Sequence, residues 1–332
     1  MKIIQIKAPK TIKTVEVRED REVGEVKIKL SKVALSRSDL SIYMGVERDI
    51  YPIVPSHSAI GYVSEADEGS GFKLGARVAI NPFIDSSPFS YENKRARSVD
   101  VMGVTKNGLL ADFVNVPLEN VYALPEGIKD EESLFLDYIA FGNNIFGNYD
   151  FNKGDYVAIV GSGIFQIVLG QLASYYQIVP ILIDQSASKL ENARNYGIYY
   201  TIDASNEDVT EKMKEITGGR MAEFSIYLQK ETAFDTAVEI TMCGGTIIMA
   251  GFGGISDDLP ANISSILNKQ LTLIGVNNGI DETASAINLL ANKIIKTEGL
   301  ISKVIDFEGV GIMFKDWAKD PSKYRKVLVN IN

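Results

Sequence analysis

The sequence predicts an α/β protein whose first part is rich in β-strands and whose second part is a parallel sheet covered by helices. To about residue 125 the chain consists of short strand-like runs, such as EVKIKLSKVAL and ARVAI, separated by Gly, Pro and Ser. From residue 155 onward strand and helix patterns alternate, beginning with YVAIVG, FQIVLGQLASYY and VPILID. Strands that are apolar on both faces and are joined by helices imply a parallel sheet.

Length and composition exclude several classes of protein. The 332 residues suit two domains. Lys and Arg number 34 against 43 Asp and Glu, which gives a net charge of −9 with no basic stripe, so nucleic acid is not an expected partner. Cys243 is the only cysteine, which excludes an intramolecular disulfide and any zinc site of the CxxC type and fits a reducing cytosol. Residues 1–10 contain no signal-peptide pattern, so we expect a cytoplasmic protein that acts on a small molecule, without a membrane partner.

Residues 156–183 contain no charged side chain, and this length would permit a membrane helix. Gly161 and Gly163 interrupt the run early, and Pro180 ends its helical part. The pattern therefore favours a buried strand, a glycine turn, a helix and a second buried strand.

The glycine turn is typical of a dinucleotide-binding site. Gly161 and Gly163 follow a strand and precede a helix, where backbone N–H groups can approach a pyrophosphate, although the third motif position is Gln166. Asp184 follows 23 residues after Gly161, where its carboxylate can bind a ribose and would repel a 2′-phosphate. This favours NAD(H) over NADP(H). The alternative is that the glycines merely shape a turn and that Asp184 caps the helix beginning near Ser188.

Segments along nearly the whole chain resemble those of the medium-chain dehydrogenases/reductases, the superfamily of the polyol, threonine and alcohol dehydrogenases. VALSRSDLSIYMG resembles the family's first catalytic segment, PSHSAIGYVSEA its histidine segment and GSGIFQIVLGQLA its cofactor turn. The resemblance implies a GroES-like β-rich catalytic domain at residues 1–150 and 282–332. It also implies a Rossmann domain, with a doubly wound parallel sheet that binds NAD, at residues 151–281. Family members are commonly homodimers or homotetramers, so a homo-oligomer is expected.

The same resemblance extends the expected cofactor site beyond the turn. Lys189 matches a family lysine that reaches the ribose, and MAGFGG and LIGVNNG resemble the segments whose backbone lies along the nicotinamide. The candidate cofactor-binding residues are therefore Gly161, Gly163, Ile164, Asp184, Lys189, Gly251, Phe252, Val276 and Asn277.

The positions that hold the catalytic zinc in the family carry other residues here. They are Ser36, His57 with Ser58, and Asp137. Neutral serine hydroxyls are poor zinc ligands, and a catalytic zinc needs about three protein ligands. Residues 82–103, where the family carries the cysteines of a structural zinc, contain no cysteine. We therefore predict no bound metal, and the alternative is a weak site at His57 and Asp137 that water or substrate completes.

His57 is the only histidine of the chain. The resemblance implies that Asp39 orients it and that the imidazole acts as a general acid and base. It further implies that Ser38 hydrogen-bonds the substrate oxygen and that Ser41 passes the proton onward, while Asp137 without a metal would pair with a substrate hydroxyl or a cation. The alternative is a hydrogen-bonded core histidine, with Ser38 and Asp39 capping a helix. The candidate catalytic residues are Ser36, Ser38, Asp39, His57 and Asp137.

The sequence thus predicts an NAD(H)-dependent oxidoreductase that interconverts a small alcohol, such as a polyol or sugar derivative, and its ketone without zinc. One alternative is a reductase of an activated C=C bond, because conjugate addition needs less electrophilic help at oxygen than carbonyl reduction does. Another is an NAD(H)-binding protein without turnover. Gln166 in the turn, and FSIYLQKE where family members usually have an acidic residue, favour the last alternative.

Overall fold

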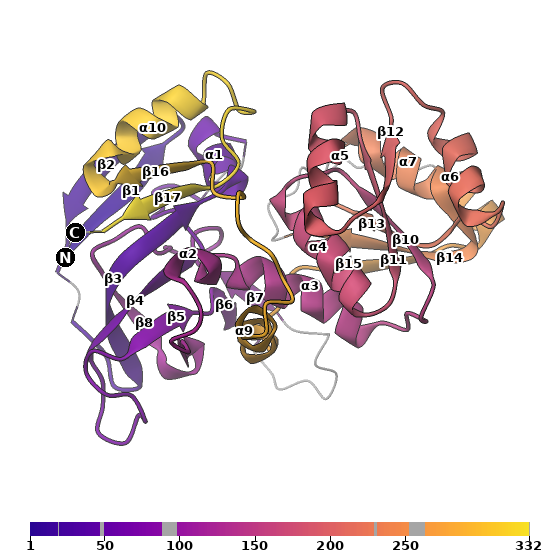
Figure 1. Cartoon of the computed structure of the whole chain (residues 1–332). Helices are drawn as coiled ribbons and strands as arrows, with labels where there is room; N and C mark the ends of the chain where they lie inside the picture. The colour runs from indigo at the N-terminus through magenta and orange to yellow at the C-terminus, as the bar shows by residue number, and fades with distance from the viewer. Residues whose placement is uncertain (19, 47–49, 88–97, 229–230, 252–262, 332) are drawn as a thin grey trace. The chain divides into compact units, whose positions relative to one another are not determined.

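A computed structural model describes the chain except for residues 19, 47–49, 88–97, 229–230, 252–262 and 332. The chain divides into two compact units (Figure 1). Unit 1 comprises Met1–Ala140, Gly279–Lys293 and Thr297–Asn332, and unit 2 comprises Phe141–Asn278 and Ile294–Lys296.

Unit 1 is built on a seven-stranded sheet. Its strands are β3 (Glu25–Leu35), β4 (Ser58–Glu65), β5 (Arg77–Ile80), β8 (Phe113–Pro117), β9 (Val121–Ala123), β16 (Lys303–Asp306) and β17 (Val327–Asn330). The order is β16-β17-β3-β4-β5-β9, with β8 paired to β3, and only the β16–β17 pair is parallel. In β3 the buried residues Val26, Ile28 and Leu30 alternate with more exposed ones, so one face of the strand covers the core.

Two hairpins and several helices complete unit 1. The hairpins are β1 (Lys2–Ala8) with β2 (Thr11–Glu16), and β6 (Phe83–Asp85) with β7 (Val99–Val101). The helices are α1 (Arg37–Met44), α2 (Asp130–Ser133), α9 (Thr283–Ala291) and α10 (Val310–Trp317), with 3-10 turns η1 (Leu118–Asn120) and η3 (Phe307–Gly309). Helix α10 contributes Met313, Phe314 and Trp317 to the core of the unit. Helix α3 (Leu136–Asn148) begins in unit 1 and continues in unit 2.

Unit 2 contains a six-stranded sheet in which every neighbouring pair is parallel. Its strands are β10 (Tyr156–Val160), β11 (Val179–Asp184), β12 (Tyr200–Asp203), β13 (Ala222–Tyr227), β14 (Thr241–Ala250) and β15 (Thr272–Val276). The order β12-β11-β10-β13-β14-β15 is that of a doubly wound dinucleotide-binding fold. Successive residues Val157, Ala158 and Ile159 of β10 are all fully buried, so both faces of the sheet are covered. The predicted fold class is therefore confirmed.

Helices pack on this parallel sheet. Helix α4 (Ile164–Tyr175) contacts β10 and β11, and α7 (Glu231–Ile240) contacts β10, β13 and β14. The remaining helices are α5 (Ala187–Ala193), η2 (Arg194–Tyr196), α6 (Val209–Thr217) and α8 (Ile263–Lys269). The uncharged run at residues 156–183 consists of β10, a turn, α4 and β11, as predicted.

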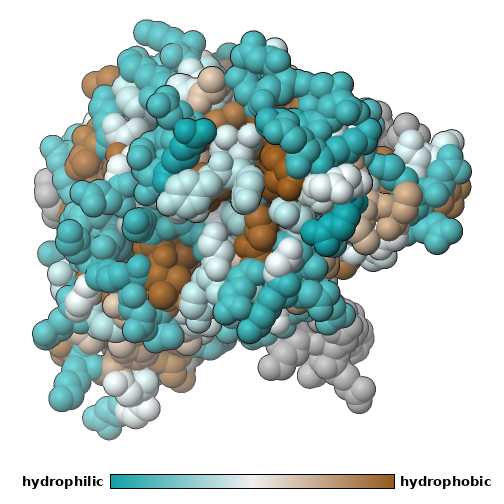
Figure 2. Space-filling view, turned by 45° about the vertical axis from the view of Figure 1, so that its right-hand side comes forward, coloured by the Kyte–Doolittle hydropathy of each residue, from teal (hydrophilic) through white to brown (hydrophobic). Residues whose placement is uncertain are grey.

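The surface of the protein is mostly hydrophilic on the face shown in Figure 2. On the face shown in Figure 2, hydrophobic residues form small separate groups among hydrophilic ones. Within the part of the chain that the structure describes, no helix has both the length and the apolar character needed to cross a membrane.

Candidate active site

The candidate catalytic residues gather in one cluster of unit 1. In the antiparallel pairing of β3 with β4, Ala34 lies opposite Ser58. This register brings Ser36, just after β3, beside His57, just before β4, with their side chains in hydrogen-bonding distance. Helix α1 begins directly after Ser36, and the first turn of α3 contributes Asp137. The cluster consists of Ser36, Ser38, Asp39, His57 and Asp137.

The imidazole of His57 is 1% exposed and has partners at both nitrogens. Nδ1 lies 2.7 Å from Asp137 Oδ2. Nε2 lies 3.1 Å from Ser36 Oγ and 3.2 Å from Ser38 Oγ. Because an ionised carboxylate only accepts hydrogen bonds, Nδ1 carries the hydrogen, and in the neutral imidazole Nε2 is then an acceptor. His57 is therefore arranged to receive a proton from a serine hydroxyl.

The two serine hydroxyls have different partners. Ser36 is buried, and its Oγ lies 2.9 Å from Asp39 Oδ2, so its only hydrogen is donated to a carboxylate. Ser38 is half-buried, and its hydroxyl can donate to His57 Nε2 at 3.2 Å or to Ser36 Oγ at 2.7 Å. Ser41 donates to a backbone carbonyl one turn earlier in α1 at 3.0 Å, so its hydrogen is used within the helix. Ser38 is thus the hydroxyl that links the imidazole to a more exposed position.

Asp39 is expected to orient His57, and in this structure its hydrogen bonds reach Ser36 and Ser56, so an effect on the imidazole would pass through Ser36. The carboxylate of Asp39 is 0% exposed and accepts hydrogen bonds from Ser36 N at 2.7 Å and Ser56 N at 2.6 Å. It therefore ties the start of α1 to the segment before β4, where Ser56 has a left-handed φ of 77°. The acid that contacts the imidazole is Asp137, from α3.

A buried lysine that the sequence analysis missed completes the cluster. Lys326 directly precedes β17, is 0% exposed, and its Nζ lies 3.8 Å from Asp137 Oδ1. The same Nζ lies 4.8 Å from the ring centroid of Phe135 and 4.4 Å from that of Tyr138. A charged residue directly before the apolar run VLV is unusual. This was the sequence signal by which Lys326 could have been identified.

Burial and neighbouring charges have opposite effects on the pKa values of Asp137 and Lys326. Burial alone would raise the pKa of Asp137, but the Lys326 ammonium and the hydrogen bond from His57 outweigh it and lower the pKa below its ordinary value. Burial lowers the pKa of Lys326, and the carboxylates of Asp137 and Asp39 oppose that change. We take Asp137 as the anion of the site, because cationic or donor groups lie on both sides of its carboxylate.

The donor set of the cluster does not fit a catalytic zinc ion. His57 Nδ1 and Asp137 Oδ2 are hydrogen-bonded to each other at 2.7 Å, and Asp137 Oδ1 faces the ammonium of Lys326. The neighbouring oxygens of Ser36 and Ser38 are neutral hydroxyls, which are poor zinc ligands. Among the residues that the structure describes, no group of three His, Cys, Asp or Glu side chains is placed to hold a metal ion. No chemical step is therefore assigned to a metal.

The glycine turn of unit 2 follows β10, where the strand order of the sheet reverses. Gly161 has φ 100°, which favours glycine, and its N–H donates to Ile183 O. Gly163 precedes α4, whose first-turn N–H groups have no acceptor within the helix and suit a phosphate. A Cβ at Gly161 or Gly163 would lie 2.6 or 2.7 Å from the side-chain amide of Gln166. This amide thus packs over the turn at the place of the third motif glycine.

The carboxylate of Asp184, at the end of β11, accepts hydrogen bonds from this turn. Its Oδ2 accepts from Ser162 N at 2.9 Å and Ser162 Oγ at 2.8 Å, and its Oδ1 accepts from Ser186 N at 2.9 Å. Ser186 is the N-cap residue of α5, which begins at Ala187. A carboxylate has about four acceptor positions, so these bonds leave room for a ribose hydroxyl.

The other candidate cofactor residues that the structure describes are Lys189, Gly251, Val276 and Asn277. Lys189 is in the first turn of α5. Gly251 N donates to O of Val276, the last residue of β15, at 3.1 Å. Asn277 follows, and its Oδ1 accepts from the side chain of Asn278 at 2.8 Å. Phe252 lies outside the described residues. The roles of these residues remain predictions.

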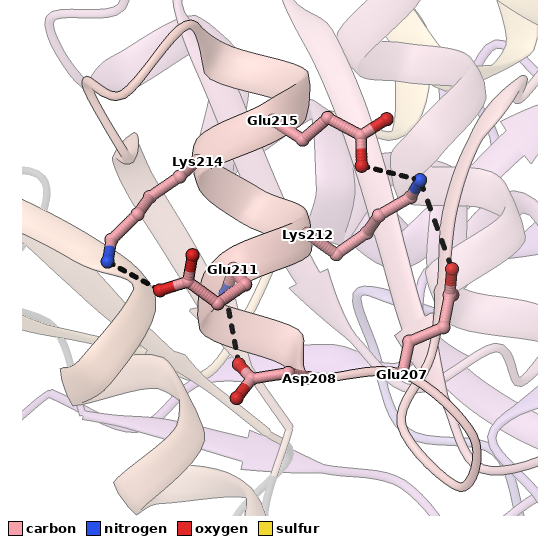
Figure 3. Close-up of a pocket in the computed structure, with 6 residues that line it drawn as sticks. All are labelled: Glu207, Asp208, Glu211, Lys212, Lys214 and Glu215. Atoms are coloured by element: carbon pink, nitrogen blue, oxygen red, sulfur yellow. Dashed lines mark hydrogen bonds and ion pairs between the residues drawn. The ribbon is translucent and has the colours of Figure 1, made fainter.

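A separate charged pocket on α6 is shown in Figure 3. It is lined by Glu207, Asp208, Glu211, Lys212, Lys214 and Glu215. Lys212 Nζ lies 2.8 Å from Glu215, and Lys214 Nζ lies 2.7 Å from Glu211. The dashed lines in Figure 3 show that these side chains pair with one another along the helix, so we assign this pocket no role in catalysis.

Comparison with known proteins gives a family match for each of the two parts of the chain. Residues 22–126 match the alcohol dehydrogenase GroES-like domain, and residues 167–292 match the zinc-binding dehydrogenase domain. A zinc-type alcohol dehydrogenase-like protein of Haemophilus influenzae is 24% identical over 98% of both chains. Sorbitol dehydrogenase 1 of Saccharomyces cerevisiae is 26% identical over 85% of this chain and 84% of that one.

The fold is also that of solved dehydrogenases. The Escherichia coli short chain alcohol dehydrogenase RspB, in complex with NADH, has a TM-score of 0.87 and 24% identity, with 99% of each chain covered. The galactitol-1-phosphate dehydrogenase of Escherichia coli has a TM-score of 0.86 and 24% identity, with 99% of this chain and 100% of that chain covered. The GroES-like domain and the zinc-binding dehydrogenase domain follow each other along the chain in the same order as its two sheets. The chain therefore belongs to the medium-chain dehydrogenase/reductase superfamily.

Proposed function

We propose that this chain is a nicotinamide-dependent oxidoreductase that interconverts a small alcohol and its ketone without a catalytic metal ion. The observation that carries the proposal is the hydrogen-bonded series from Ser38 Oγ through His57 to Asp137, with distances of 3.2 and 2.7 Å. This series can move the proton that accompanies hydride transfer. The names of the relatives sorbitol dehydrogenase 1 and galactitol-1-phosphate dehydrogenase support a polyol or sugar derivative as the substrate.

The residues of the cluster have distinct tasks in this reaction. The nicotinamide, when bound, accepts or supplies the hydride. In alcohol oxidation the substrate hydroxyl gives its hydrogen to Ser38 Oγ, and Ser38 gives its own hydrogen to His57 Nε2. The resulting imidazolium keeps its Nδ1–H bond to Asp137, whose negative charge stabilises it. In ketone reduction the same transfers run in reverse, and Ser38 delivers a proton to the carbonyl oxygen.

The cofactor is assigned to residues 151–281, and the substrate chemistry to residues 1–150 and 282–332. NAD(H) is favoured over NADP(H), because the carboxylate of Asp184 lies at the end of β11, next to the Gly161 turn, and would repel a 2′-phosphate. The backbone of the Gly161–Gly163 turn and the N-terminus of α4 would bind the pyrophosphate.

We further propose that the protein is a cytoplasmic homodimer or homotetramer. Strand β15 lies at the edge of the parallel sheet, and nearby α8 exposes Ile263 and Leu267. An exposed edge strand with apolar neighbours is suited to pairing with a second copy.

The proposal is tested on purified protein whose metal content has been measured. Turnover is assayed with NADH against ketones and enones, and with NAD⁺ against alcohols that include polyols. Ser38→Ala and His57→Gln are each expected to lower kcat by ~10²-fold or more, because each interrupts the proton series. Ser41→Ala is the matched control, since its hydroxyl bonds within α1, and its kcat is expected to stay within about twofold of wild type.

The outcomes separate the alternatives. Stoichiometric zinc with loss of activity on chelation, or unchanged turnover in both Ser38→Ala and His57→Gln, would refute the metal-free mechanism. Turnover of enones alone would instead indicate a C=C reductase. NADH binding without turnover of any substrate would indicate a non-catalytic NAD(H)-binding protein.

A further inference from the structure

We infer that the ammonium group of Lys326 is the resident cation of the His57–Asp137 site and that it prevents a divalent metal ion from binding there. The inference deepens the proposed function and rests on it, because a metal-free reaction needs the two buried carboxylates of the cluster to be balanced by another positive charge. The experiment below distinguishes failure of this inference from failure of the proposed function.

The surroundings of Lys326 fix its position and include groups that favour the charged form of its side chain. Its backbone oxygen accepts hydrogen bonds from Ser302 N and Ser302 Oγ, both at 2.9 Å, which fixes the residue at the start of β17. Its side chain is fully buried, and its Nζ lies over the rings of Phe135 and Tyr138. Aromatic faces attract an ammonium group, and such attraction is stronger away from water.

Lys326 and His57 contact the two oxygens of Asp137 from different sides. Oδ2 lies 2.7 Å from His57 Nδ1, while Oδ1 faces Lys326 Nζ at 3.8 Å. Among the described residues, neither Oδ1 nor Nζ has a hydrogen-bond partner, although both atoms are buried. Opposite charges buried this close attract each other, and separating either from the other would be costly. Both carboxylate oxygens are therefore already directed at groups of the protein.

The charges of the cluster explain why the ammonium would exclude a metal. Asp39 and Asp137 are two fully or nearly fully buried carboxylates, and Lys326 is the buried lysine beside them. Without the ammonium, this concentration of negative charge next to an imidazole would attract a divalent cation. With it, an ion bound to Asp137 would lie within a few ångströms of a second positive charge, in a site with little water to screen their repulsion.

The experiment compares Co²⁺ binding by wild type, Lys326→Gln, Lys326→Met, Lys326→Arg and the control Lys303→Met. Gln removes the charge but keeps a hydrogen-bond donor for Asp137. The test therefore does not depend on whether the Met variant folds. Lys303 is a matched control on the neighbouring strand β16, where its Nζ contacts Tyr324 outside the cluster. Binding is followed by the visible absorption of Co²⁺. It is located by paramagnetic shifts of the imidazole ¹H NMR signals, which belong to the one histidine of the chain.

Lys326→Gln and Lys326→Met are expected to bind Co²⁺ with a Kd at least ~10-fold lower than that of wild type, with shifted His57 signals. Lys326→Arg and Lys303→Met are expected to behave as wild type. If wild type is metal-free and active but neither neutral variant gains Co²⁺ at His57, the inference about Lys326 is overturned while the proposed function stands. If wild type itself holds stoichiometric metal at His57, both fail. If Lys326→Arg gains Co²⁺ as strongly as Lys326→Gln, charge is not the cause and the inference is also overturned.

Discussion

Asp39→Asn is predicted to destabilise unit 1, because this carboxylate joins two segments of the candidate site. Asp39 accepts hydrogen bonds from Ser36 N at 2.7 Å, Ser36 Oγ at 2.9 Å and Ser56 N at 2.6 Å. Asparagine of the same shape has one acceptor oxygen and one NH₂ group. Whichever way the amide is turned, NH₂ faces a buried backbone N–H, either that of Ser36 or that of Ser56. At least one donor therefore loses its acceptor.

The size of the effect follows from these bonds. A buried donor left without an acceptor costs ~1–3 kcal/mol. The remaining hydrogen bonds become neutral, which costs ~1 kcal/mol each relative to bonds with a carboxylate. Removing a buried negative charge offsets part of this loss. We therefore expect the free energy of unfolding of unit 1 to fall by about 3 kcal/mol.

Chemical denaturation followed by fluorescence measures this change. Trp317 is the only tryptophan of the chain, is fully buried and lies in unit 1, so its signal reports on that unit. Asp306→Asn is the control, because Asp306 is an exposed residue of the same unit, and its effect is expected to stay within about 0.5 kcal/mol. If Asp39→Asn changes the free energy of unfolding no more than Asp306→Asn does, the role given to the Asp39 hydrogen bonds is wrong.

Two further predictions concern the cofactor and the pH dependence of stability. Asp184→Asn removes the charge that would face a 2′-phosphate, so the ratio of the NADPH Kd to the NADH Kd is expected to fall by ~10-fold in titrations of nucleotide fluorescence; an unchanged ratio would contradict the assignment. Asp137 has a folded-state pKa below its ordinary value, so the stability it contributes is present above about pH 4 and is lost as pH falls through the lower folded pKa. Asp137→Asn should therefore lose less stability than wild type between about pH 5 and pH 3, measured by Trp317 fluorescence, and equal losses would show that Asp137 is not responsible.

The elements of unit 2 could be predicted from the sequence because their signals are local. The run from β10 to β11 is uncharged and is interrupted by Gly161 and Gly163 at the turn, and the structure has a strand, a turn, a helix and a strand there. Gly161 adopts a φ of 100°, a conformation that its own residue type permits. Hydrophobic periodicity and backbone conformation depend on neighbours in the chain, so the class of fold follows from them.

The partners of His57 could not be predicted in this way. The family resemblance assigned Asp39 to the imidazole, whereas the structure places Asp137 there, with Lys326 on the far side of its carboxylate. His57, Asp137 and Lys326 are separated by long stretches of sequence. They meet because β4 and β17 both pair with β3, and because α3 begins beside these strands. The sequence alone thus determined the strand and helix pattern and the glycine turn. Which charges face the one imidazole was decided by strand register and helix packing, because contacts between distant segments exist only once the sheet has formed.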